Sequence, residues 1–359
     1  MTTQNMRQSF AEQTGQAGDA MEYANPARSQ VETMFYTGTD PWHRIGTKLD
    51  NPATAEEAIE AAGLAWNVTL QPTYIYRPGV DAYGNRRTDI PVQTGRSAVV
   101  REDTGKVFGV FSPKYTPLQN SAAFTFFDAV VGAGAAIYET AGSLKGGSRI
   151  WILASLPGDV GLDGDGIKRY VMLSNSHDGS SAIDMRFCAR RVVCWNTFKM
   201  ALTNGSENVR IRHVGDVLSK VNSTREILGL ADAYFHNFME GVEKLTATSV
   251  PDNQAQAYFD SVVGVQHDAP NPQVTRINAA SSMMALYKGE GMGSSLPTAY
   301  GTAWGAFNAV SEQLEHRRWA NGYGGDVALQ TERRLSSSFF GSGAGVEQHA
   351  WSLALNLAL

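Results

Sequence analysis

Hydrophobic and polar residues alternate over much of the first two-thirds of the chain, a pattern typical of half-buried strands. Turns that contain glycine separate two pairs of such segments, which predicts two hairpins, 96–101 with 106–111 and 136–141 with 149–156. Further strands are expected at 66–76, 170–174 and 182–193. A capping box at Thr54 and Glu57 starts a short helix, and Phe124 and Phe127 lie on one face of a second helix.

The pattern changes near residue 215, where apolar residues begin to repeat every seven positions. The repeat consists of two sets, Val221, Leu228, Phe235, Val242 and Thr224, Ala231, Phe238, Leu245. It predicts a long helix over 217–245 that packs against a partner helix. More helices are expected at 253–263, 272–286 and 302–318, then a small-residue linker at 336–345 and a short apolar helix at 350–359.

These elements predict an α+β fold, in which an antiparallel sheet of hairpins carries helices on one face and is followed by a mainly helical C-terminal half. Four regions are expected: a disordered tail (1–33), an α+β sheet domain (34–215), a helical region with the heptad helix (216–335), and a linker with a terminal helix (336–359).

Composition narrows the class of protein. The chain has 359 residues, of which 43% are hydrophobic, enough for a sizeable core. Its formal net charge of −5 argues against attraction to nucleic acid through overall charge, so any such contact needs a local patch. The sequence contains no run of about 18 apolar residues, so no membrane span is predicted. The first 30 residues lack the apolar centre of a signal peptide, and the two cysteines, read as free thiols, fit a reducing cytoplasm.

Basic and aromatic residues gather in one predicted strand and the turn after it, at 185–199. The window 186–225 holds eight basic residues against two acidic ones. Proteins bind single strands with cations along the phosphates and aromatic rings against the bases. The candidate contacts are Arg186, Arg190, Arg191, Lys199, Arg210 and Arg212 for phosphates, Trp195 and Phe198 for stacking, and the amide of Asn196.

A structural interpretation of the same residues stays open. In it Trp195 and Phe198 belong to the core, Asn196 satisfies turn backbone, and the arginines pair with acids such as Asp184 and Glu207.

No catalytic signature of similar clarity occurs, so the sequence predicts no catalytic residue, cofactor or metal. His177, Asp178 and Gly179 fit an ordinary turn between strands. Cys188 and Cys194 lack the close spacing of zinc ligands. The phosphate-binding loop motif and the serine nucleophile motif are both absent.

Three separated stretches resemble a known family. They are Pro41-Trp42-His43-Arg44-Ile45-Gly46, Arg190-Arg191-Val192-Val193-Cys194-Trp195-Asn196-Thr197 and Thr302-Ala303-Trp304-Gly305-Ala306-Phe307-Asn308-Ala309-Val310. Together they resemble the phage- and plasmid-borne family catalogued as domain of unknown function 932, over roughly residues 34 to 335. The resemblance implies a mobile-element protein in the bacterial cytoplasm. More loosely, the order of hairpins and helices is similar to that of phage single-strand annealing proteins.

The first hypothesis is therefore a non-enzymatic protein that binds single-stranded DNA, self-associates and acts in strand annealing or recombination. The alternative is a mobile-element protein that acts on a host protein, in anti-defence or as a replication accessory. The third is a metal-dependent nuclease, which requires carboxylates such as Glu102, Glu139, Asp178 and Asp184 to converge.

Overall fold

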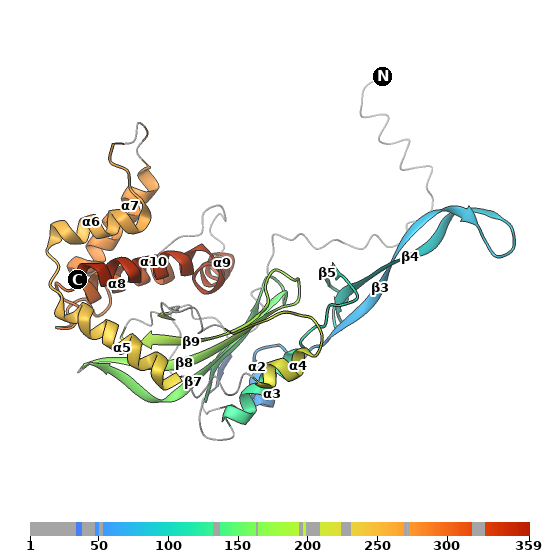
Figure 1. Cartoon of the computed structure of the whole chain (residues 1–359), viewed down its shortest axis with the longest axis horizontal. Helices are drawn as coiled ribbons and strands as arrows, with labels where there is room; N and C mark the ends of the chain where they lie inside the picture. Colours follow the sequence, from blue (N-terminus) through green and yellow to red (C-terminus); the bar gives the residue numbers. More distant parts are fainter. Residues whose placement is uncertain are drawn as a thin grey trace.

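The computed structural model describes residues 34–37, 47–49, 53–131, 137–162, 164–193, 197–198, 209–223, 231–268, 271, 273–317 and 327–359. The tail expected at 1–33 and the motif at 41–46 lie outside these residues. The α+β fold predicted from the sequence is confirmed, with antiparallel sheets in the N-terminal half and several helices in the C-terminal half (Figure 1).

In the described residues, the larger of two sheets has eight strands. They are β1 (Met34–Thr37), β2 (Thr47–Leu49), β6 (Ile137–Leu144), β7 (Arg149–Leu162), β8 (Asp165–Ser176), β9 (Ile183–Arg191), β10 (Thr197–Phe198) and β11 (Val209–Ile211). Their order is β10-β9-β8-β7-β6-β1-β2, and β11 also pairs with β9. Only β1 and β2 run parallel among these pairs. The predicted hairpin of β6 and β7 is confirmed, and its turn places Lys145, Gly146 and Gly147 at positive φ, which glycine adopts readily.

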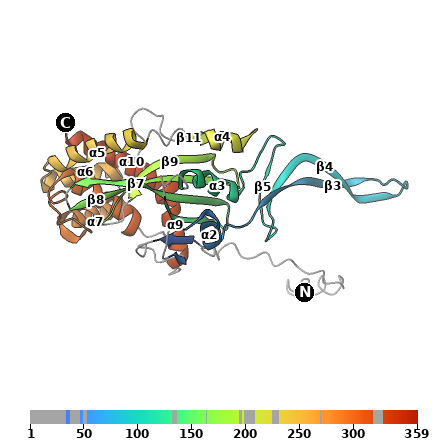
Figure 2. The same ribbon diagram turned by 90° about the horizontal axis from the view of Figure 1, so that it is seen from below.

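The second sheet contains β3 (Val68–Val80), β4 (Arg86–Arg101) and β5 (Val107–Phe111). β5 pairs with β4 only at residues 97–100, so the rest of β3 and β4 forms a ribbon of two strands. We call residues 72–96 the arm. It projects from the body on the side opposite the C-terminal helices, as two perpendicular views show (Figures 1 and 2). The sequence predicted both strands but not their length.

The helices have the following bounds in the described residues: α2 (Ala55–Ala61), α3 (Asn120–Val131), α4 (Val217–Ser223), α5 (Ala231–Ala247), α6 (Asp252–Val263), α7 (Val274–Ala285), α8 (Ala303–Glu312), α9 (Val327–Phe340) and α10 (Ser342–Leu357). The capping box before α2 is confirmed, because the Thr54 and Glu57 side chains each accept a hydrogen bond from the other's backbone. In this part of the chain no helix is both long and apolar enough to cross a bilayer.

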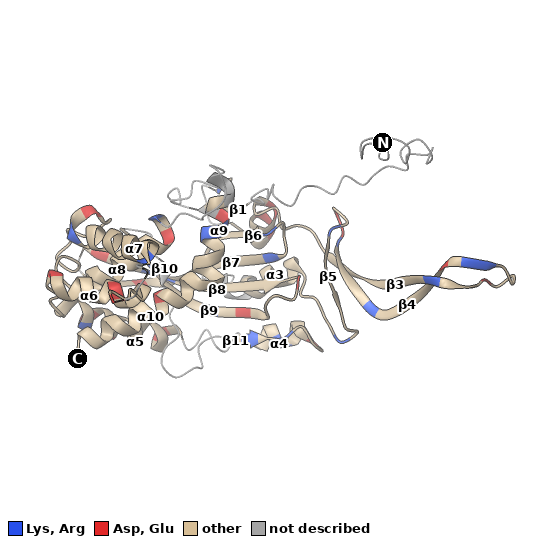
Figure 3. Ribbon diagram, turned by 90° about the horizontal axis from the view of Figure 1, so that it is seen from above, with Lys and Arg blue, Asp and Glu red and all other residues tan. Residues whose placement is uncertain are grey.

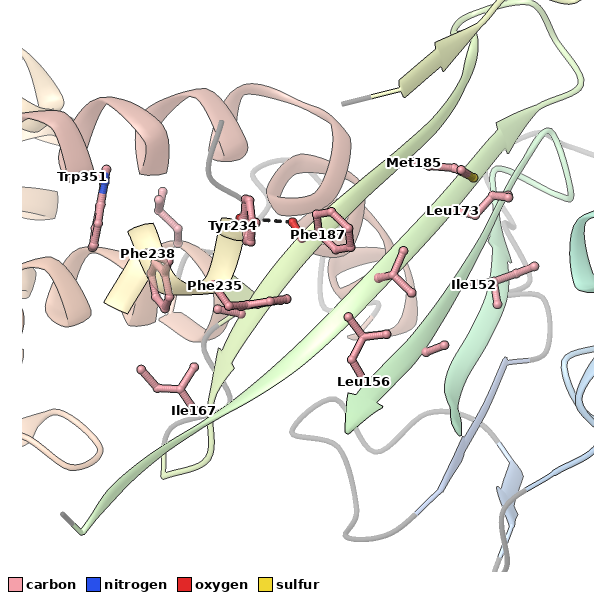
Figure 4. Packing of buried hydrophobic residues seen from close by; sticks show 14 of the residues in the cluster. Ile152, Leu156, Ile167, Leu173, Met185, Phe187, Tyr234, Phe235, Phe238 and Trp351 are labelled. Atoms are coloured by element: carbon pink, nitrogen blue, oxygen red, sulfur yellow. Dashed lines mark hydrogen bonds between the residues drawn. The ribbon is translucent and has the colours of Figure 1, made fainter. Parts of the chain in front are cut away.

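Helix α5 packs against one face of the large sheet (Figure 4). The rings of Tyr234 and Phe235 lie 5.3 and 6.0 Å from the ring of Phe187 in β9, and the ring of Phe238 lies 5.5 Å from that of Trp351 in α10. The predicted heptad positions that the structure describes are buried, but they face the sheet as well as other helices. Residues 224–230, between α4 and α5, lie outside the described chain, so the continuity of the predicted helix is untested.

The opposite face of this sheet packs against α9. Leu335 of α9 lies in one cluster with Trp151, Tyr170 and Cys188 from β7, β8 and β9. Helices therefore contact both faces of the sheet, whereas the sequence predicted helices on one face. The linker predicted at 336–345 is wrong, because these residues form the end of α9 and the start of α10. The terminal helix accordingly begins at Ser342 and not at residue 350.

Candidate nucleic-acid interface

Two of the predicted phosphate contacts, Arg186 and Arg210, meet around one carboxylate. β9 and β11 are antiparallel neighbours in which Arg210 lies opposite Asp184, and Arg186 follows on the same face two residues along β9. Asp184 Oδ1 accepts from Arg186 Nε at 2.7 Å, and Oδ2 accepts from Arg210 Nε at 3.2 Å. This single carboxylate thus orients two guanidinium groups.

A third cation, Arg149, joins them from the first position of β7. Its guanidinium carbon lies 4.6 Å from the centre of the Phe340 ring, and its Nη2 donates to Ser180 Oγ at 3.2 Å. Burial lowers the pKa of Arg149, and the charge of Arg186 lowers it further, against the opposite effect of Asp178 and Asp184. Arg149 therefore lies within the electrostatic influence of Arg186, Asp178 and Asp184.

Arg212 completes what we call the arginine cluster, defined as Arg149, Arg186, Arg210 and Arg212. It is exposed and follows β11 directly, two residues from Arg210, so alternation carries it to the same face. Asp184 pairs with Arg186 and Arg210, and Asp178 acts on Arg149, so two aspartates accompany the four arginines of this cluster. The cluster is therefore a local positive surface on a chain whose net charge is −5.

The cluster also has unused hydrogen-bond donors. Asp184 engages only the Nε atoms of Arg186 and Arg210, and their terminal NH2 groups donate to no group within the described residues. The side chain of Arg210 is 69% exposed, whereas Asp184 is only 7% exposed. The carboxylate is therefore covered, and the guanidinium of Arg210 is open to an anion, whereas the side chain of Arg186 is only 16% exposed. Phosphate is an anion that guanidinium groups bind in pairs of hydrogen bonds.

Arg190 and Arg191 serve other contacts. On the same sheet face as Arg186, Arg190 pairs with Glu139 of β6 and lies over the ring of Tyr170, so it is largely buried. Arg191 points the other way, is fully buried, and forms a bidentate pair with Asp165 at 2.6 and 2.8 Å. The alternation of these side chains along β9 was predicted, but the structure places neither guanidinium at the open surface, and we leave both out of the proposed interface.

The remaining predicted contacts are only partly placed. Trp195, Asn196 and Lys199 lie outside the described residues, and of Phe198 only its backbone in β10, paired with β9 at Ala189, is described. The described residues therefore do not test the prediction that Trp195 and Phe198 stack on bases.

Three of the carboxylates that the nuclease hypothesis requires each contact a different group. Glu139 pairs with Arg190, Asp184 lies in the arginine cluster, and Asp178 accepts from Ser176 Oγ at 2.7 Å. Throughout the described chain, no three His, Cys, Asp or Glu side chains gather in a group that could hold a metal ion.

Sequence reasoning missed Arg149. Part of the signal was present, because the hairpin predicted for β6 and β7 places this residue at the start of a strand, and a turn was predicted between the strands that form β8 and β9. What the sequence did not indicate is that β7 pairs with β8, which brings Arg149 to the same end of the sheet as Arg186.

Comparison with known proteins gives one match. The family model described as Domain of unknown function (DUF932) matches residues 107–337, which include the whole arginine cluster but not the arm. No curated protein and no solved structure matches the chain.

Proposed function

The chain belongs to a family described only as a domain of unknown function, and from its geometry we propose that it binds single-stranded nucleic acid through the arginine cluster. The observation that carries this proposal is the set of guanidinium N–H groups around the covered carboxylate of Asp184 that donate to no acceptor among the described residues. Guanidinium groups bind phosphate oxygens in pairs, and such contacts need no particular base sequence.

The charge distribution favours binding through this local cluster over binding through the overall charge of the chain. A chain of net charge −5 repels nucleic acid at long range, so binding depends on the few cations that the sheet brings together. Figure 3 shows blue segments at the ends of β7 and β11 and a red segment in β9, which lies between these two strands. Contacts of this kind make affinity fall as salt rises, by about 0.7 log units per log unit of salt for each phosphate on a single strand.

The proposal extends to a biological setting. In it the protein belongs to a phage or plasmid, acts in the bacterial cytoplasm, and self-associates. Several copies then hold stretched DNA strands so that complementary bases meet, and annealing needs neither a nucleotide cofactor nor a metal. The resemblance to the family and the order of hairpins and helices support this setting.

Exposed residues of the cluster allow a direct test. The double variant Arg210→Gln/Arg212→Gln removes two surface charges and leaves the buried core untouched. We expect weaker binding to a labelled single strand, and a slope of log affinity against log salt that is shallower by about 1.4, the sum for two phosphate contacts. Lys244→Gln, an exposed charge removed from α5, is the matched control and leaves both quantities unchanged.

Two results contradict the proposal. The first is the absence of wild-type binding at about 50 mM salt, where electrostatic contacts are strong. The second is a double variant with the affinity and slope of the wild type. Absent binding together with a stable complex with a host protein would favour the alternative, an interaction protein of a mobile element.

A further inference from the structure

The arm exposes an unusual amount of apolar and aromatic surface. The exposed fractions are 49% for Tyr74, 69% for Tyr76 and 91% for Tyr83, and the neighbouring Ile75 and Val80 are also exposed. A ribbon of two strands is marginally stable in water on its own. Exposed apolar patches rimmed by polar residues usually mark a binding surface.

The tip of the arm is held in shape by its own side chains. The carboxylate of Asp81 accepts hydrogen bonds from the backbone N–H groups of Tyr83 and Asn85, both at 2.9 Å. Gly84 completes the turn at a φ of 84°. The turn therefore displays Tyr83 in a fixed place without a contact to the body.

Charge on the arm favours an anionic partner. Residues 72–96 hold four arginines and two aspartates. Both acids are occupied, Asp81 by the turn backbone and Asp89 by a bidentate pair with Arg87. Within the described part of the chain, Arg77, Arg86 and Arg96 form no ion pair with a carboxylate. Figure 3 shows blue segments along the ribbon of β3 and β4 toward its tip.

Strand register sets the spacing of the rings. Tyr74 lies opposite Gln93 and Tyr76 opposite Pro91, so both tyrosines lie on one face of the ribbon, two residues apart. Two residues of strand span about 6.7 Å. That spacing leaves room for a base against each ring. Arg77 is the next residue along β3, so alternation places it on the opposite face of the ribbon from the two rings.

We infer that the arm binds unpaired bases of single-stranded nucleic acid, with Tyr74 and Tyr76 stacking on bases while Arg77, Arg86 and Arg96 contact the phosphates. This inference rests on the proposed function and adds the class of ligand, a strand whose base faces are open. Bases in a duplex are stacked on one another, so the arm discriminates against duplex. The arginine cluster, in contrast, contacts only the backbone.

The test replaces the rings without removing charge. Tyr74→Thr/Tyr76→Thr keeps residues that favour strands. We expect a loss of about ten-fold or more in affinity for a single strand, because each stacked base contributes substantially to binding. The salt slope stays that of the wild type, since no cation is lost. Tyr74→Phe/Tyr76→Phe retains binding, and Tyr300→Thr, which removes a tyrosine that is 70% exposed in the helical half, is the matched control.

Separate outcomes decide the separate claims. If the wild type binds and the threonine variant binds equally well, the inference is overturned while the proposed function stands. If the wild type does not bind, the proposed function fails first. If the threonine variant keeps its affinity but its sedimentation coefficient differs from that of the wild type without nucleic acid, the arm serves contact with a second copy, which also overturns the inference.

Discussion

Replacing Arg191 is expected to damage the fold and to leave the nucleic-acid contacts of the described surface in place. Arg191 and Asp165 form an ion pair in which neither side chain is more than 2% exposed. Asp165 also accepts hydrogen bonds from Thr298 Oγ1 at 2.8 Å and Trp304 Nε1 at 3.1 Å. The pair thus joins the ends of β8 and β9 to the loop before α8 and to α8 itself, which links the sheet to the helical half.

The magnitude follows from what each substitution leaves behind. Removing one partner of a buried pair costs about 3–5 kcal/mol, because the other charge stays buried without compensation. Arg191→Met leaves Asp165 with two donors, so we expect a cost near the lower value, about 3 kcal/mol. Asp165→Leu leaves a fully buried guanidinium without its carboxylate partner, although it still donates to the Gly293 carbonyl at 3.2 Å, so a cost near 5 kcal/mol is expected.

The double variant separates the pair from its parts. Arg191→Met/Asp165→Leu removes both charges, and its loss of stability is expected to be smaller than the sum of the two single losses. Burial raises the pKa of Asp165, but the hydrogen bonds and charge of Arg191 lower it more, so the carboxyl is ionised at neutral pH. The contribution of Asp165 is present above its unfolded pKa of 3.8 and is lost as pH falls through the lower folded value.

Urea denaturation followed by far-ultraviolet circular dichroism measures these losses, and oligonucleotide binding is measured on the same samples. The reasoning is refuted if Arg191→Met unfolds at the wild-type urea concentration yet binds single strands more weakly. That result would give Arg191 the surface role predicted from the sequence.

Two further predictions concern stability. Burial lowers the pKa of His177 from 6.5 to about 4, so protonation of this side chain favours the unfolded state. We expect the free energy of unfolding to fall by about 3 kcal/mol as pH drops between these values. His177→Gln keeps a hydrogen-bond donor for Asn120 and should show a flatter dependence of stability on pH in the same denaturation assay, and an unchanged dependence would contradict this. A Cβ on Gly305 would lie 1.9 Å from the Ala299 carbonyl oxygen, so Gly305→Ala should lower the midpoint of thermal unfolding despite the helix propensity of alanine. Gly345→Ala in α10, where the added Cβ meets no atom within 4 Å, should keep or raise this midpoint. Equal midpoints for the two variants would contradict the prediction, because the close approach at Gly305 would then not destabilise the fold.

The fold class was predictable from the sequence because turn chemistry marks the hairpins. Glycines at 105, 146 and 147 interrupt alternating segments, and all three take positive φ in the structure. The length of the arm was not predictable, because proline at 72, 78 and 91 and glycine at 79 and 95 normally end strands. An outlying ribbon with bulges at these places accommodates them. The small residues at 336–345 indicated a linker for a similar reason, but serine and glycine there allow close packing between α9 and α10.

The candidate site was predictable in part. Alternation along β9 and β11 correctly separated the two faces, and the structural interpretation that Asp184 pairs with arginines is confirmed for Arg186 and Arg210. The burial of Arg191 was not predictable, because it depends on contacts with Asp165 and α8, which are distant in sequence. Strand pairing, and not local pattern, decides which arginines reach the surface.

The most direct test of the central claim is equilibrium binding of the wild-type protein to one labelled strand of about 30 nucleotides, compared with the same sequence as duplex, over a range of salt. The account predicts tighter binding to the single strand, with affinity that falls steadily as salt rises. Equal affinity for duplex and single strand, or no binding at about 50 mM salt, would contradict it.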